Sequence, residues 1–139
     1  MSDLRSVLNA AKTVAIVGCS DNPFRASNRA AHSLVESGYT VLPVNPKYRT
    51  VNGIACFPSF NVIPEELTID IINIFRNSRH TLDAVESVIA RSERTGTKPV
   101  IWTQPGVSSP EAELAAIRAG LSYIQDRCIM TELARINRF

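Results

Sequence analysis

The stretch TVAIVGCSDNPFRASNRAAHSLVESG, residues 13–38, decides the fold of this chain. It opens with an apolar, mostly β-branched run at residues 14–17, which predicts a strand buried on both faces, as in parallel sheets. Gly18 ends the run, and a polar turn follows. A helix is expected from residue 28, with Ser27 as its N-cap and Gly38 just past its end. Its apolar positions recur at helical spacing: Ala30, Ala31, Leu34 and Val35.

A strand, a loop and a helix in this order place a helix N-terminus beside the loop. The unpaired backbone N–H groups and the partial positive charge of a helix N-terminus favour an anion. Arg25 and Arg29 add formal positive charge at this point. The serines and Asn22 could instead serve only turn hydrogen bonds, as in an ordinary strand-to-helix connection. The two arginines favour the anion site.

The rest of the chain alternates strands with helices. Pro43 indicates an edge strand or a strand end, and the Asn52-Gly53 pair marks a tight turn in a segment of short strand and helical turns. Strands are predicted at residues 39–44, 68–75, 99–103 and 121–125, and helices at residues 78–96, 110–120 and from 126 onward. This alternation predicts an α/β, Rossmann-like, doubly wound and mainly parallel sheet of five strands, with helices on both faces. Ligands of such sheets bind beyond the carboxyl ends of the strands.

Length and composition exclude several classes of protein. The 139 residues predict one domain, residues 1–139. Fifteen basic residues balance 13 acidic ones and only 6% are aromatic, so nucleic-acid binding is not favoured. No stretch reaches transmembrane length and none is typical of a signal peptide, so a cytoplasmic protein without membrane contact is expected. Three cysteines without metal-type spacing indicate reduced thiols, with no metal site.

The loops do not fit the common dinucleotide pattern. Only Gly18 is present where a G-x-G-x-x-G loop would have three glycines, and no Walker A sequence occurs. The second strand ends in Asn45-Pro46-Lys47 rather than in the acidic residue that holds an NAD ribose. Lys47 and Arg49 favour a phosphate instead, either the 2′-phosphate of NADP or the 3′-phosphate of coenzyme A. Lys47 could also be a solvated surface lysine.

Five motifs in order resemble one known family. They are GCSDNPFRAS, VLPVNPKY, INIFRNS, WTQPGV and DRCIMTE, and the resemblance covers residues 13–132. The chain is similar to the stand-alone CoA-binding proteins, which resemble the CoA-binding domain of the succinyl-CoA synthetase α-subunit. The resemblance implies a Rossmann-like fold that binds coenzyme A as its small-molecule ligand, without a known reaction.

The resemblance also implies which residues surround the ligand. The first loop would hold the CoA diphosphate, a lysine would hold a phosphate near the adenosine, and the third-strand loop would meet the nucleotide and the pantetheine arm. The first loop contributes Gly18, Cys19, Ser20, Asp21, Asn22, Pro23, Arg25 and Ser27, the lysine is Lys47, and the third-strand loop contributes Ile74, Phe75 and Arg76. Cys19 departs from the family pattern, in which many relatives carry alanine. Arg76 could alternatively pair with Asp70 or Glu66.

Two other functions stay open. The protein could be an NADP-linked or acyl-CoA-transforming enzyme, or a CoA-binding subunit whose protein partner supplies the chemistry. No catalytic residues can be named, because His32 and His80 come without a recognisable acid partner.

Cys128 follows Asp126-Arg127 at the predicted start of the last helix. A helix N-terminus and an arginine lower a thiol pKa, so Cys128, or Cys19, could form a mixed disulfide with CoA. The alternative is a small buried residue that packs the helix.

Overall fold

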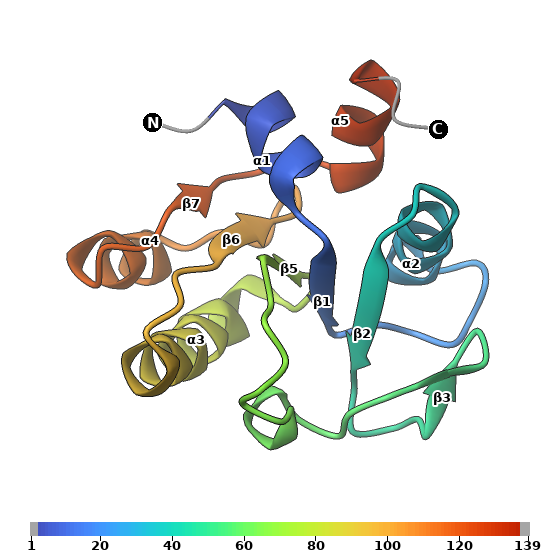
Figure 1. Cartoon of the computed structure of the whole chain (residues 1–139), viewed down its shortest axis with the longest axis horizontal. Helices are drawn as coiled ribbons and strands as arrows, with labels where there is room; N and C mark the ends of the chain where they lie inside the picture. Colours follow the sequence, from blue (N-terminus) through green and yellow to red (C-terminus); the bar gives the residue numbers. More distant parts are fainter. Residues whose placement is uncertain (1–2, 137–139) are drawn as a thin grey trace.

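The computed structural model describes residues 3–136, in which five parallel strands form one sheet (Figure 1). The strands lie in the order β2-β1-β5-β6-β7, and each neighbouring pair is parallel. Their bounds are Thr13–Val17 (β1), Thr40–Val44 (β2), Ile71–Ile74 (β5), Val100–Thr103 (β6) and Tyr123–Ile124 (β7). The predicted Rossmann-like α/β fold is confirmed.

Helices cover both faces of this sheet. One layer contains α1 (Leu4–Ala10), α2 (Ala26–Glu36) and α5 (Ile129–Arg135), and the other contains α3 (Thr81–Thr95) and α4 (Pro110–Arg118) (Figure 1). In β1, Val14 and Ile16 pack into the first layer, whereas Ala15 and Val17 pack into the second. Because successive side chains point to opposite faces, a strand between two layers must be apolar throughout.

Two strands, β5 and β7, are shorter than predicted by more than one residue. β5 starts at Ile71 because the Asp70 carboxylate accepts hydrogen bonds from the N–H groups of Lys12 and Thr13 (2.9 and 3.0 Å), donors that a longer strand would pair. β7 holds two residues, and the positive φ of Asp126 (55°) turns the chain soon after it.

The segment after β2 forms the predicted short elements. β3 (Thr50–Val51) and β4 (Ile54–Ala55) make an antiparallel hairpin, and Asn52 and Gly53 at its turn both have positive φ. Two 3₁₀ turns, η1 (Phe60–Val62) and η2 (Ser78–His80), precede α3. β2 lies at the edge of the sheet, as Pro43 predicted. Within residues 3–136 no helix is long and apolar enough to cross a bilayer.

Candidate functional site

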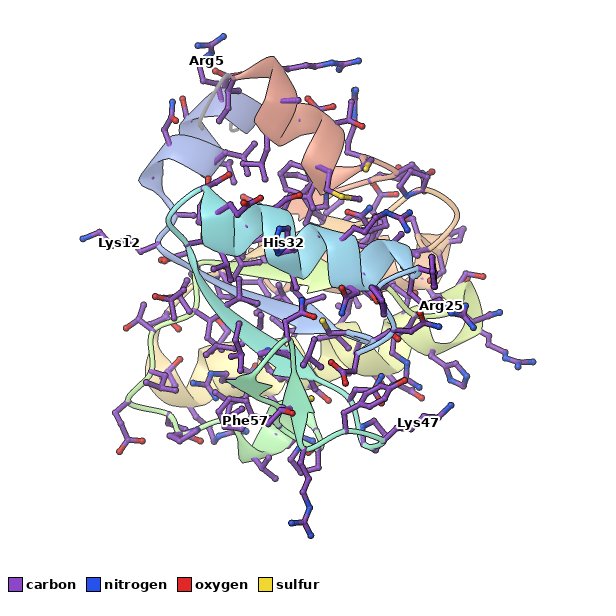
Figure 2. All side chains as sticks on the ribbon, turned by 90° about the vertical axis from the view of Figure 1, so that its right-hand side faces the viewer. Arg5, Lys12, Arg25, His32, Lys47 and Phe57 are labelled. Carbon is purple, nitrogen blue, oxygen red and sulfur yellow. The ribbon has the colours of Figure 1, made fainter. Side chains whose placement is uncertain are left out.

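Loops from all five parallel strands meet at the carboxyl edge of the sheet. Arg25 follows β1 and Lys47 follows β2, and in Figure 2 both side chains lie at this end of the molecule. Lys12 precedes β1 and projects from the opposite end (Figure 2). The predicted ligand edge therefore carries positive charge from two different loops.

The loop between β1 and α2 is held by its own hydrogen bonds. Ser27 Oγ accepts from the N–H of Ser20 (2.9 Å), and Ser20 Oγ accepts from the N–H of Asn22 (3.0 Å). Asn22 Oδ1 accepts in turn from the N–H of Phe24 (2.9 Å). These contacts fix the loop without help from a ligand, so a binding surface is present in the free protein.

The predicted N-cap of the first helix is wrong. α2 begins at Ala26, so Ser27 lies inside its first turn, where its hydroxyl serves Ser20. Arg25 occupies the N-cap position and makes no side-chain capping bond. A helix that starts without a side-chain cap leaves first-turn N–H groups available to an anion.

A cavity of about 440 Å³ opens at this helix start, and we call it the loop cavity. It is lined by Gly18, Ser20, Asn22, Arg25, Ala26, Ser27, Asn45, Lys47, Tyr48 and Phe75. Among these described lining residues there are two cations, Arg25 and Lys47, and no carboxylate. The Tyr48 hydroxyl lies 3.5 Å from Ser20 Oγ and joins the second loop to the first. The charge and the donors of the loop cavity suit a phosphate-bearing ligand.

The β3–β4 hairpin is tied to the same loop. Asn28 Nδ2 donates to the carbonyl oxygen of Ser20 (2.8 Å) and to Asn52 Oδ1 (2.9 Å). Asp21 Oδ1 accepts from the N–H of Asn52 (3.0 Å). The hairpin turn thus supports the back of the loop, and Asp21 serves as a structural acceptor.

A second cavity of about 430 Å³ adjoins the first, and we call it the helix cavity because α3 forms one wall. The two cavities share Gly18, Asn45 and Lys47. The other lining residues of the helix cavity are Val17, Val44, Pro46, Pro58, Ser59, Phe60, Asn61, Arg76, His80, Asp83, Ala84 and Ser87. Its walls combine apolar and polar groups, which suits a flat heterocycle better than an isolated anion.

The structure brings together most of the residues that the sequence singled out. Gly18, Ser20, Asn22, Arg25, Ser27, Lys47 and Phe75 line the loop cavity, and Arg76 lines the helix cavity. Cys19 and Ile74 are fully buried in the core, and Asp21 and Pro23 are exposed but line neither cavity. Asp70, suggested as a partner for Arg76, instead accepts from the backbone at the start of β1.

Sequence reasoning missed several lining residues. Asn45 directly follows β2 at the carboxyl edge, so its position was the available signal. The segment 58–61 carries no sequence signal for this role, because it reaches the helix cavity only through tertiary packing. His80 lines the helix cavity. The exposed His32 has an acid partner that the sequence did not reveal, since its Nε2 lies 3.2 Å from Oε1 of Glu36 on the same helix, α2.

The two candidate cysteines differ in their surroundings. Burial raises the pKa of the Cys19 thiol to about 12, with smaller contributions from Cys56 and Asp21. Burial also acts to raise the pKa of Cys128, but hydrogen bonds from Thr131, Met130 and Gln104 outweigh it and lower that pKa. The lowered pKa of Cys128 agrees with the prediction, while the buried Cys19 is a protonated core residue.

We therefore expect iodoacetamide to alkylate Cys128 before the other two cysteines. The thiolate is the nucleophile, and a lowered pKa places more Cys128 in that form near neutral pH. Intact-mass analysis and peptide mapping after a short pulse at neutral pH would measure the order of modification. A Cys128→Ser variant is the control and should lose the fast phase, and modification of Cys19 in the folded protein would contradict this prediction.

Fold and site together define a Rossmann-like α/β protein whose first loop opens into a positively charged groove. The chain belongs to the CoA binding domain family, whose sequence model matches residues 12–134. The predicted family is thereby confirmed.

Relatives of this chain come from bacteria and archaea. An uncharacterized protein of Bacillus subtilis (strain 168), YneT, is 30% identical over 128 residues, which cover 92% of this chain and 90% of YneT. A solved structure of a hypothetical protein from Pyrococcus horikoshii OT3 is 38% identical, with a TM-score of 0.88, over 97% of this chain and 90% of that one. The ADP-forming acetate–CoA ligase I of Archaeoglobus fulgidus is 39% identical over 61 residues, 44% of this chain and 9% of the ligase.

Proposed function

We propose that this protein binds coenzyme A, or an acyl-CoA, in the groove formed by the loop cavity and the helix cavity. The observation that carries the proposal is the start of α2, where a helix without a side-chain cap opens into a cavity with two cations. Membership of the CoA binding domain family supports the same ligand. The proposed role is binding, not catalysis.

The diphosphate of the ligand fits the loop cavity. Ala26 and Ser27 from the first turn of α2 line it, so that their backbone lies next to the bound anion. Arg25 adds a formal charge beside them, and the Ser20 hydroxyl adds a polar contact. Charge-assisted hydrogen bonds of this kind are the strong ones in phosphate recognition.

The adenosine of the ligand fits the helix cavity, where Pro58 and Phe60 offer apolar surface to a base. Lys47 lines both cavities and is therefore the residue that we assign to the 3′-phosphate, which is carried by the ribose that joins the diphosphate to the base. The uncharged pantetheine arm would then leave along Phe75, toward the loops that follow β6 and β7.

We expect a Lys47→Ala variant to bind CoA about 10- to 150-fold more weakly, because one charge-assisted contact is worth about 1.5–3 kcal/mol. The variant should also lose most of the preference for CoA over 3′-dephospho-CoA. Isothermal titration calorimetry with both ligands, and with NADP as a third, measures the affinity and the preference together.

Lys12→Ala is the matched control, since it removes an exposed lysine at the opposite end of the sheet and should leave both affinities unchanged. An unchanged preference in Lys47→Ala would assign the 3′-phosphate to another cation of the groove. Absence of CoA binding by the unaltered protein at millimolar ligand would overturn the proposed function. Tighter binding of NADP than of CoA would show that NADP, not CoA, is the ligand of this groove.

A further inference from the structure

We propose that the outer face of α4 is the surface through which two copies of this chain associate as a two-fold symmetric dimer. The α4 face consists of Glu111, Leu114, Ile117 and Arg118, all of which are exposed. In Figure 1, α4 lies at the margin of its layer, on the far side of the molecule from α2. None of the four residues lines the loop cavity or the helix cavity, so this association is independent of the proposed ligand site.

The apolar side chains of α4 are distributed in reverse of the pattern usual for a surface helix. The helix buries Ala112 and Ala116 against the core, while Leu114 is 48% exposed and Ile117 is 58% exposed. A surface helix of a monomer normally places its large apolar residues toward the core and its small or polar residues outside. α4 does the opposite, so its largest apolar side chains are left about half exposed.

A mostly apolar recess adjoins the helix, and its lining is buried or half-buried apart from Ile117 and Ser122. Ile117 lines this cavity of about 180 Å³ next to the edge strand β7. The other lining residues of this cavity are Val7, Val100, Leu121, Ser122, Tyr123 and Ile124. Exposed apolar surface that extends over neighbouring elements is typical of a protein contact, whereas single exposed residues are not.

Two opposite charges flank the apolar centre of the α4 face. Glu111 and Arg118 are seven residues apart, which is about 10 Å along a helix. Leu114 lies between them, near the midpoint. When two copies of α4 cross antiparallel at Leu114, each Glu111 faces Arg118 of the second copy, and the leucines meet at the axis.

This self-complementary pattern commits the surface to a second copy rather than to a different protein. A two-fold contact requires one patch to be complementary to itself, and an acid and a base placed symmetrically about an apolar centre meet that requirement. A parallel arrangement would instead place like charges opposite each other. Two copies could not instead pair extensively through their β7 edges, because β7 holds only two residues.

Sedimentation velocity of the full chain over a micromolar concentration series tests the dimer directly. We expect the unaltered protein to sediment as a dimer and Leu114→Glu to raise the dimer dissociation constant about a hundredfold, since two carboxylates would meet at the axis. Val35→Glu is the matched control, because Val35 is 44% exposed on α2, and it should leave the dimer intact. Circular dichroism confirms that each variant is folded.

Charge reversal gives a second test that does not depend on the leucine. Glu111→Arg alone should raise the dissociation constant about tenfold, and adding Arg118→Glu should restore it, because the symmetric pairs form again with opposite sign. Any of three results would overturn the proposal. The unaltered protein could remain monomeric at 100 times the lowest concentration of the series. Leu114→Glu could leave the dimer dissociation constant unchanged, or the double charge reversal could fail to restore it.

Discussion

A Gly18→Ala variant is expected to lose about 2–4 kcal/mol of unfolding free energy and about tenfold in affinity for CoA. Gly18 has φ +87°, a conformation that strains an L-residue. An added Cβ would lie 3.0 Å from the Phe75 carbonyl oxygen and 3.3 Å from Arg76 Cγ. The loop after β5 would have to move away, and it contributes Phe75 to the loop cavity and Arg76 to the helix cavity. Urea denaturation and calorimetric titration measure the two losses.

Gly38→Ala separates the backbone strain from the collision. Gly38 has a similar φ of +96°, but nothing lies within 4 Å of its added Cβ. It follows α2, away from the residues of both cavities. The unfolding free energy of this variant should fall by about 1–2 kcal/mol, and its affinity for CoA should stay unchanged. Equal losses in the two variants would show that contact with the β5 loop is unimportant.

Replacing Arg91 with methionine is expected to lower the unfolding free energy by about 2–4 kcal/mol. Arg91 is 5% exposed, and its guanidinium donates to the carbonyl oxygens of Ile63 (2.7 Å), Pro64 (2.7 Å) and Leu67 (2.9 Å). It also lies over the Phe60 ring, 5.7 Å from the centroid. Methionine keeps an apolar stem and removes all three donors. The carbonyl groups of the segment before β5 would then lose their buried partner.

Arg94→Met is the control for this prediction. Arg94 lies three residues further along α3 and pairs with Glu65 at 2.6 Å, but both side chains are about half exposed (46% and 51%). Exposed ion pairs contribute about 0–1 kcal/mol, so thermal and urea midpoints should hardly change. A loss in Arg91→Met as small as that in Arg94→Met would contradict the anchoring role of Arg91.

The sequence predicted what depends on neighbours along the chain. The β1–α2 unit and the Pro43 edge strand follow from local patterns and are present. The start of α2 was misplaced because the Ser27 hydroxyl binds Ser20, a contact that capping preferences do not contain.

Tertiary contacts explain what the sequence could not predict. The helix cavity combines segment 58–61 with the start of α3, and no local pattern links these two parts of the chain. From its residue type alone, Arg91 would be expected on the exposed face of its helix. It is buried instead, because three carbonyl oxygens accept hydrogen bonds from its guanidinium. The loop cavity was more accessible to prediction, since most of its wall comes from one continuous loop.

Within residues 3–136, neither margin of the sheet offers a long unpaired strand edge. At one margin, Phe57 already bonds to the β2 backbone, its N–H donating to the Pro43 carbonyl oxygen and its carbonyl oxygen accepting from the N–H of Asn45 (both 2.9 Å). At the other, β7 offers only two residues of ladder. Long unpaired edges are the templates on which proteins polymerise by strand addition. Concentrated solutions of this protein should accordingly resist fibril growth by strand addition.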